Sequence, residues 1–222
     1  MAGSMKEEAL EYATRGWAVF PVNTVNDGVC SCGNPDCTSP GKHPATANGF
    51  HDATTDPRQV AEMWDANPDA NIGIRTGSES GIFVLDIDPD HGGHESVAEM
   101  VGQHGPLPET VVARTGGGGD HHGFRHPGEK VRNRNAMRPG VDVRGDGGFI
   151  VASPSSHVKG KYRWKDGCSP ADRSPAPAPD WLVDEILRRT REANMATGAN
   201  VEPTSSSLPE GLVKRCETYV DS

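Results

Sequence analysis

Three of the five cysteines in this 222-residue chain lie within eight positions, and a histidine follows six residues later. These residues are Cys30, Cys32, Cys37 and His43. Three thiolates and one imidazole form the usual ligand set of a closed, tetrahedral structural zinc site. The Gly and Pro residues between them supply the turns needed to wrap the segment around one ion. We therefore predict a zinc-stapled loop over residues 30–43, with a structural rather than a catalytic ion.

Two other interpretations of the cysteine cluster are a set of reduced thiols and a disulfide. The odd number of cysteines and the absence of a signal peptide argue against a disulfide framework. Cys168 and Cys216 stand apart from the cluster and are assigned no role. Residues 1–4, which precede a second methionine at Met5, are expected to be a leader left by cloning.

The composition bounds the size of the core and the class of protein. Hydrophobic residues make up 34% of the chain and aromatic residues 5%, which predicts one modest core with long loops rather than two large domains. No apolar run approaches the ~20 residues needed to cross a bilayer. We expect a cytoplasmic protein with no membrane partner.

The pattern of apolar residues predicts an α+β fold in which helices and strands are mixed along the chain. Helices are expected over 6–15, from Asp56-Pro57 onward, and over 95–103 and 180–193. Strands are expected over 17–22, 71–76, 81–88, 110–115, 120–125, 141–144 and 149–152, the second and third being joined by a polar turn. Residues 171–179 look like a linker. Residues 5–190 are expected to form one catalytic domain, and 191–222 a linker or the start of a helical region with a short helix near 212–219.

Two carboxylates end one of the predicted strands. Successive side chains of a strand alternate between its faces, so Asp86 and Asp88 share a face. Neighbouring carboxylates repel each other unless a divalent cation lies between them. The alternative is a pair of solvated acids where a strand runs into a loop.

The same alternation recurs at Asp142 and Arg144. A third carboxylate on a neighbouring strand would complete a two-metal site, and Arg144 would neutralise phosphate charge. An ordinary surface ion pair is the other interpretation.

A run of four glycines, residues 116–119, precedes His121. Such a run lets the backbone turn sharply and approach a ligand closely. Strand alternation places His122 with Phe124 and His121 on the opposite face, where its imidazole could contact a phosphate oxygen. A flexible loop without a ligand is the simpler alternative.

The net charge of −9 argues against a generally basic nucleic-acid-binding surface. Residues 125–165 nevertheless carry ten Lys and Arg against three acids. This cationic stretch could follow the phosphates of a single strand, with binding that weakens as salt rises. It could equally be a solvated charged loop.

Seven segments in order resemble one known family. They are residues 16–21, 41–44, 71–77, 86–88, 115–121, 141–145 and 147–157. Over residues 6–190 the chain resembles the N-terminal catalytic domain of bifunctional DNA primase/polymerases (prim-pol), a branch of the archaeo-eukaryotic primase superfamily found in phages and plasmids. Family members usually follow the histidine with apolar and aromatic residues, whereas His122 and Gly123 stand here.

This resemblance implies a primase-like, two-lobed fold. An α/β lobe with the zinc-stapled loop would face a lobe related to the RNA-recognition (RRM) fold, with the active-site cleft between them. It also implies that Asp86, Asp88 and Asp142 hold two Mg²⁺ or Mn²⁺ ions, and that His121 contacts the phosphates of the incoming nucleotide.

The function expected from the resemblance is template-dependent nucleotidyl transfer, as a DNA primase and DNA polymerase in phage or plasmid replication in a host cell. The triphosphate would be held by His121, Arg144, Arg75, Lys42 and His157. The partners would be a single-stranded DNA template, (deoxy)nucleoside triphosphates and a fused or associated helicase domain. Two alternatives remain: another metal-dependent phosphate enzyme such as a nuclease, and a non-catalytic, zinc-stapled DNA-binding module of a replication initiator.

Overall fold

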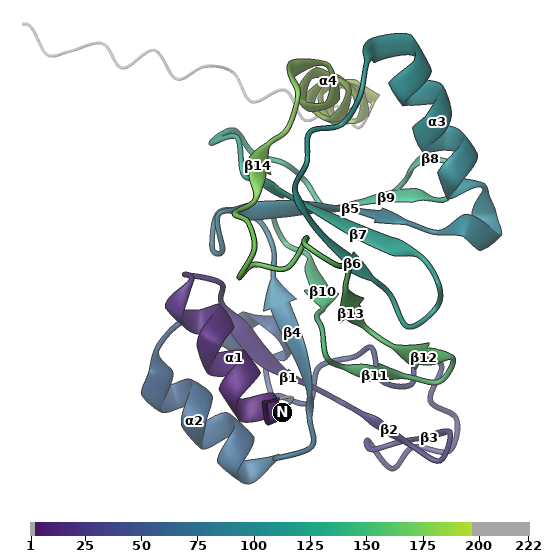
Figure 1. Ribbon diagram of the computed structural model, residues 1–222. Helices are drawn as coiled ribbons and strands as arrows, with labels where there is room; N and C mark the ends of the chain where they lie inside the picture. Colours follow the sequence, from purple (N-terminus) through teal and green to yellow (C-terminus); the bar gives the residue numbers. More distant parts are fainter. Residues whose placement is uncertain (1–2, 197–222) are drawn as a thin grey trace, which may run out of the picture.

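Two main β-sheets organise the protein in a computed structural model that describes residues 3–196, with side chains through residue 188 (Figure 1). The smaller sheet is antiparallel, with strand order β1-β4-β10. Its strands are β1 (Val19–Val22), β4 (Asn71–Arg75) and β10 (Phe149–Val151).

The larger sheet has seven strands in the order β13-β6-β7-β5-β9-β8, with β14 parallel to the end of β7. Its strands are β5 (Ile82–Ile87), β6 (Val111–Arg114), β7 (Asp120–Arg125), β8 (Arg134–Arg138), β9 (Val141–Arg144), β13 (Arg163–Trp164) and β14 (Ala176–Pro177). Two short hairpins complete the strands. They are β2 (Val25–Asn26) with β3 (Val29–Cys30), and β11 (Ser156–His157) with β12 (Gly160–Lys161).

Four α-helices flank these sheets. Helices α1 (Met5–Thr14) and α2 (Pro57–Ala66) lie beside the small sheet, whereas α3 (Gly93–His104) and α4 (Asp180–Ala196) lie on the far side of the large sheet (Figure 1). Two 3₁₀ turns are η1 (Gly49–Asp52) and η2 (Pro89–His91). None of the helices within residues 3–196 is long and apolar enough to cross a membrane.

Side-chain caps begin the first two helices. The hydroxyl of Ser4 accepts from the backbone N–H of Glu7, whose carboxylate accepts from the N–H of Ser4, so a capping box starts α1. Ser4, which was grouped with the expected leader, therefore takes part in the fold. Asp56 caps α2 and Pro57 is its first residue, as predicted.

Alternation along β5 divides its side chains between two cores. Phe83, Leu85 and Ile87 pack with residues of α3 and α4. Ile82 and Val84 face the other way and pack with α1, α2 and the small sheet. The next side chain on this second face is Asp86, which therefore emerges where the apolar core between the two sheets ends.

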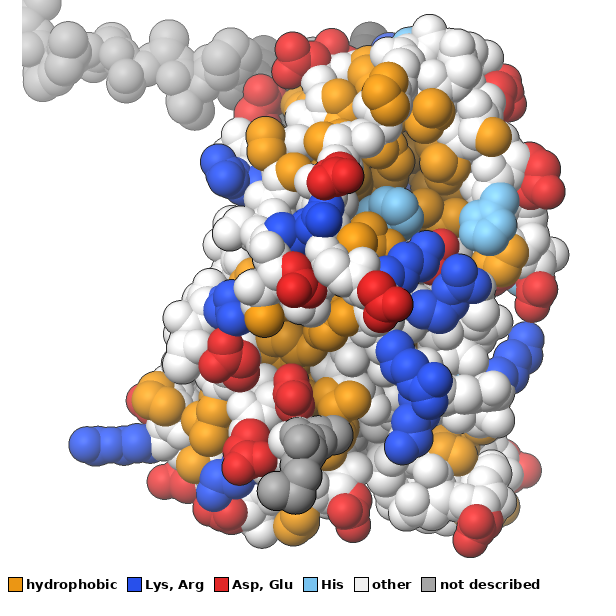
Figure 2. All heavy atoms as spheres, viewed as in Figure 1, with side chains coloured by type: hydrophobic (Ala, Val, Ile, Leu, Met, Phe, Trp, Pro, Cys, Tyr) orange, Lys and Arg blue, Asp and Glu red, His pale blue; other side chains and the backbone are white. Residues whose placement is uncertain are grey.

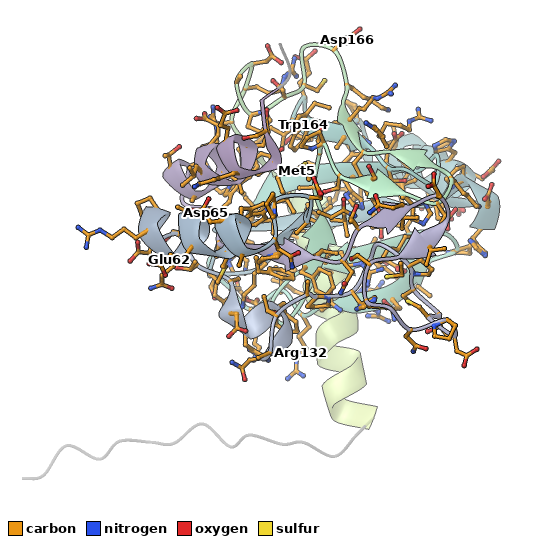
Figure 3. The ribbon with its side chains drawn as sticks, turned by 90° about the horizontal axis from the view of Figure 1, so that it is seen from below. Met5, Glu62, Asp65, Arg132, Trp164 and Asp166 are labelled. Carbon is orange, nitrogen blue, oxygen red and sulfur yellow. The ribbon has the colours of Figure 1, made fainter. Side chains whose placement is uncertain are left out.

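The edge strand β13 ties α1 to the large sheet. The indole Nε1 of Trp164 donates to the hydroxyl of Tyr12 at 2.9 Å, and that hydroxyl donates to the carbonyl of Ser153 at 2.7 Å. Figure 3 shows Trp164 beside this helix. Neither the indole N–H of Trp164 nor the hydroxyl of Tyr12 is therefore left without a hydrogen-bond partner inside the core.

The strands expected over 71–76 and 81–88 exist, but they do not form one sheet. Strand β4 pairs with β1 and β10, and β5 pairs with β7 and β9. Only the isolated bridge between Gly77 and Ile82 joins their ends. Residues 71–74 are all buried, so both faces of β4 are covered, and the strand takes the middle place in the small sheet.

Several short elements escaped the sequence-based prediction. The segment 171–179, expected to be a linker, contains β14, which pairs with β7. Strand β8 and the two hairpins are too short or too polar to show a periodic apolar pattern. The expected helix near 212–219 and most of the region 191–222 lie outside the described residues.

Asp146 holds in place the β4–β5 turn, where the chain passes from the small sheet to the large one. Its carboxylate accepts from the backbone N–H of Ser78 at 3.0 Å and lies 3.1 Å from Nε2 of His126. The side chain of Asp146 is 14% exposed and that of His126 is 8% exposed. Burial alone would raise the pKa of Asp146, but the N–H of Ser78 and the imidazole lower it overall. The aspartate thus holds the β4–β5 turn against the end of β7.

We expect Asp146→Ala to lower the free energy of unfolding by about 1–3 kcal/mol, because it leaves a buried imidazole and a backbone N–H without their acceptor. Urea unfolding followed by circular dichroism measures this. Asp166→Ala is the matched control, since Asp166 is exposed and projects from the periphery (Figure 3). Equal stability of the two variants would contradict the role given to Asp146.

Candidate active site

Three neighbouring strands bring a histidine and two carboxylates into one row. In the antiparallel register, Asp86 of β5 lies opposite His121 of β7 and, on its other side, opposite Asp142 of β9. Directly opposed residues of antiparallel strands project from the same face. Nε2 of His121 lies 3.4 Å from Oδ1 of Asp86. Asp142 therefore lies on the strand next to that of Asp86, the position suggested for a further carboxylate.

Arg144 lies between the two carboxylates. Its Nη2 donates to Oδ2 of Asp142 at 2.6 Å and to Oδ2 of Asp86 at 3.3 Å. The other oxygen of Asp142 accepts from the backbone N–H of Ala136 at 2.7 Å. One guanidinium nitrogen thus contacts both carboxylates. Carboxylate oxygens are hard ligands of the kind that suit Mg²⁺ or Mn²⁺.

The environment keeps Asp86 ionised. Burial would raise the pKa of this carboxyl, but the nearby His121 and Arg144 outweigh burial and lower the pKa to about 2. At neutral pH Asp86 therefore carries a negative charge, which is partly balanced by the guanidinium of Arg144.

Asp88 follows β5 and borders the same cavity, but its carboxylate is turned toward η2. It accepts from the backbone N–H of Asp90 at 2.9 Å and lies 2.9 Å from Nδ1 of His91. Among residues 3–196, Asp86, Asp88 and Asp142 do not form a group whose ligand oxygens all lie within 4.8 Å of one another. Only two of the three predicted acids are brought together directly.

The backbone around Asp88 is held by two glycines. The N–H of Asp88 donates to the carbonyl of Gly140 at 2.7 Å, and the N–H of Gly93 donates to the carbonyl of Asp88 at 2.9 Å. A Cβ atom on Gly93 would lie 2.4 Å from the Gly140 oxygen, and one on Gly140 would lie 2.4 Å from the Gly93 nitrogen. The start of α3, the β8–β9 turn and Asp88 can meet only because neither position has a side chain.

The row of charged residues opens into a cavity of about 1110 Å³. Its other walls come from the loop before His43, from η1 and β10, and from the β11–β12 hairpin. Lys42 and His157 border this cavity, as predicted for phosphate-contacting groups. Burial and the charge of Lys42 lower the pKa of His157.

Arg75 differs from the other predicted nucleotide contacts, because it is not among the residues that line the cavity. Its guanidinium pairs with the carboxylate of Glu79. The same group lies 5.6 Å from the centre of the Phe50 ring. Arg75 therefore does not line the cavity itself but packs against Phe50, which does.

The two adjacent histidines have different surroundings. His121 is 7% exposed and borders the cavity, where its ring centre lies 5.9 Å from that of Tyr162. Burial lowers the pKa of His122 to about 4, so this imidazole is neutral at pH 7. The geometry thus favours His121 as the group that can meet a ligand.

The glycine run forms a tight turn between β6 and β7. A Cβ on Gly119 would lie 2.4 Å from the carbonyl oxygen of Ile87, and one on Gly116 would lie 2.5 Å from Cβ of His157. Part of this run therefore allows close packing against β5 and the β11–β12 hairpin. Thr115, Gly117 and Gly119 border the cavity.

Cys30, Cys32, Cys37 and His43 form the metal-binding cluster predicted from the sequence. Their ligand atoms all lie within 4.8 Å of one another. Nε2 of His43 lies 3.3 Å from Sγ of Cys30 and 3.5 Å from Sγ of Cys37. Tetrahedral zinc, with Zn–S near 2.3 Å and Zn–N near 2.05 Å, requires an S···N separation of about 3.6 Å. The cluster could therefore hold a zinc ion.

Asn71 links this cluster to the cavity and was not identified from the sequence. Its buried side-chain amide donates to the carbonyls of Asn23, Gly41 and Ser156, and its oxygen accepts from the N–H of Ser156. Gly41 lies between the metal ligand His43 and the cavity-lining residues 38–40. The signal in the sequence is a polar side chain at the start of an otherwise apolar strand.

Tyr162 is a second residue that sequence reasoning missed. It is buried and borders the cavity next to His121. Burial and the charge of Asp86 raise the pKa of its hydroxyl well above the usual value, so the hydroxyl stays protonated.

The cationic stretch 125–165 does not form one continuous strip. Strands β8 and β13, which both belong to it, lie at opposite edges of the large sheet. Several of its charges are balanced within the protein, as when Lys165 pairs with Asp120 and Arg138 with Glu185. Figure 2 shows Lys and Arg side chains gathered on the face where β13 and the β11–β12 hairpin lie.

Comparison with known proteins gives one family match. The family model described as bifunctional DNA primase/polymerase, N-terminal, matches residues 9–181. No curated protein matches the chain.

We expect the purified protein to hold about one zinc ion per chain. Cys32→Ser should reduce the zinc content and lower the melting temperature by at least about 5 °C, because binding of a structural metal contributes directly to folding. Metal analysis and thermal unfolding, with and without chelator, measure both effects. Cys168→Ser is the matched control, because Cys168 lies outside the cluster. A zinc-free protein of undiminished stability would show that the cluster is only a set of thiols.

Proposed function

The chain belongs to the bifunctional DNA primase/polymerase family, and from this we propose that it is a template-dependent nucleotidyltransferase. It would use nucleoside triphosphates to extend a strand that is paired with a DNA template. The observation that carries the proposal is the row of His121, Asp86 and Asp142 on neighbouring strands, with Arg144 between the carboxylates. Two carboxylates on neighbouring strands beside a large cavity are groups that could hold the metal cations used in phosphoryl transfer.

The two-metal part of the proposal concerns Asp86, Asp88 and Asp142. Two Mg²⁺ or Mn²⁺ ions held by these acids would supply the charge that activates the attacking 3′-hydroxyl and stabilises the departing pyrophosphate. Asp86 and Asp142 already share a cationic partner. Asp88 completes the set when its carboxylate turns from His91 toward the cavity.

The remaining residues act on the triphosphate. Arg144, which borders the cavity beside the two carboxylates, would pair with phosphate oxygens. His121 would contact a phosphate through its imidazole, and Lys42 and His157 would bind from the opposite wall. Arg75 contributes indirectly, because Glu79 neutralises it and its guanidinium supports Phe50.

The proposed catalytic unit spans residues 5–190 and consists of two lobes. The small sheet with α1 and α2 carries the loop 30–43, with zinc as its structural ion, and the large sheet with α3 and α4 is the lobe related to the RRM fold. The cavity between them would take the nucleotide and a single-stranded template. The resemblance adds phage or plasmid replication in the host cytoplasm, and a fused or associated helicase domain.

Two other functions are separated from this one by simple assays. A nuclease would shorten a labelled DNA strand in the presence of Mn²⁺ without incorporating nucleotides. A DNA-binding module of a replication initiator would bind DNA but show no metal-dependent synthesis. Incorporation of labelled nucleotides on primed and unprimed single-stranded DNA therefore tests the proposal.

We expect Asp86→Asn and Asp142→Asn each to reduce nucleotide incorporation by at least about 100-fold, because each removes a charge that binds the cations stabilising the transition state. Circular dichroism must show a folded protein in each case. Asp69→Asn, an exposed aspartate near the end of α2, is the control. A rate of nucleotide incorporation within twofold of that of the unaltered chain in both variants would contradict the catalytic assignment.

Lys42→Ala should raise the KM for the nucleoside triphosphate about tenfold and leave kcat nearly unchanged, because it removes one charge-assisted contact to phosphate. Steady-state incorporation at varied nucleotide concentration measures both constants. Lys6→Ala removes an exposed lysine that pairs with Asp65 outside the cavity, and should change neither constant. An unaltered KM in Lys42→Ala would remove this residue from the binding site.

A further inference from the structure

Two phenylalanine rings are stacked on the wall of the cavity. Phe50 of η1 and Phe149, the first residue of β10, have ring centres 5.9 Å apart and planes inclined by 28°. Both side chains are half-buried and both border the cavity. Two stacked apolar rings thus line a cavity whose wall also carries Asp86, Asp142 and Arg144.

The distribution of phenylalanine in the chain sharpens this observation. Three of the five phenylalanines are fully buried: Phe83 and Phe124 in the core beside α3 and α4, and Phe20 in a separate small apolar cluster. The other two are Phe50 and Phe149. These two are only partly buried: they pack against the Phe20 cluster on one side and line the cavity wall on the other.

Neighbouring side chains of the small sheet pack against the two rings and hold them in place. The buried ring of Phe20 packs edge-on against Phe149 with centres 5.3 Å apart. Arg75 lies over Phe50 and is also the cross-strand neighbour of Phe149 in the β4–β10 pairing. Rings held in this way are preorganised, so a ligand that stacks on them need not order them first.

We propose that the base of the incoming nucleoside triphosphate stacks on the Phe50–Phe149 pair. The inference rests on the proposed function in that it takes the occupant of the cavity to be a nucleotide. The phosphates would be held by the charged residues that line the same cavity, and the base would lie at its aromatic wall. Every base has a π-face, so stacking accepts all four bases and leaves their selection to the template.

The test compares a nucleotide with a ligand that has phosphates but no base. Equilibrium binding of each of the four nucleoside triphosphates, of inorganic tripolyphosphate and of a single-stranded DNA oligonucleotide is measured with Mg²⁺ by titration calorimetry on the full chain. Phe149→Leu and Phe50→Leu remove one ring each and keep an apolar side chain, and Phe149→Tyr restores a ring. Trp181→Leu is the matched control, because this aromatic residue stacks on His104 away from the cavity. Thermal unfolding verifies that each variant is folded.

The leucine variants should bind every nucleoside triphosphate about tenfold more weakly. Their affinity for tripolyphosphate should stay within twofold, and Phe149→Tyr should bind nucleotides within threefold of the unaltered chain. Equal losses for nucleotide and tripolyphosphate, or no loss for nucleotides in either leucine variant, would overturn the inference. A loss confined to a single-stranded oligonucleotide would also overturn it, since the template would then occupy the stack.

This experiment separates the inference from the proposed function. A chain that binds nucleotides through the rings but incorporates none contradicts the polymerase assignment and leaves the stacking site standing. A chain that incorporates nucleotides with unaltered affinity in both leucine variants contradicts only the stacking site. An unaltered chain that binds no nucleotide overturns both.

Discussion

The hydrogen-bonded register of β5 between β7 and β9 is the constraint on which the candidate site depends. It sets Asp86 opposite His121 on one side and opposite Asp142 on the other. Because side chains alternate along a strand, a shift of one residue in either pairing would move a site residue to the face covered by α3 and α4. The apolar residues of β5 oppose such a shift, since Phe83, Leu85 and Ile87 would leave their core.

The chain crosses between sheets where many proteins make a simple hairpin. Strand β4 belongs to the small sheet and β5 to the large one, so the short turn between them sets the spacing of the two halves. Asp146 fixes this turn, and Trp164 fixes the opposite edge through Tyr12. Both sheets line the cavity, the large one through Asp86 and Asp142 and the small one through β10, and residues 38–40 with Lys42 close one of its sides.

Much of this arrangement could be predicted from the sequence, because it depends on local rules. Strand alternation predicted that His121, Asp142 and Arg144 would project from the faces they occupy, and ligand spacing predicted the Cys₃His cluster. Features that depend on distant partners could not be predicted. The separation of β4 from β5 and the division of the cationic stretch between two sheet edges follow from tertiary contacts that leave no periodic signal. The turn of Asp88 toward His91 and the pairing of Arg75 with Glu79 join residues close in the chain, but no apolar pattern marks such polar contacts.

The contact between Gly93 and Gly140 limits how this protein can be redesigned. The two backbones touch beside Asp88, at the place where helix α3 meets the β8–β9 turn. A library of substitutions around the cavity can vary the side chains of the hairpin or the loop while the frame stays intact. A single methyl group at either glycine would instead collide with the backbone of the other glycine and of Asp88, so even the smallest side chain would force the helix and the turn apart.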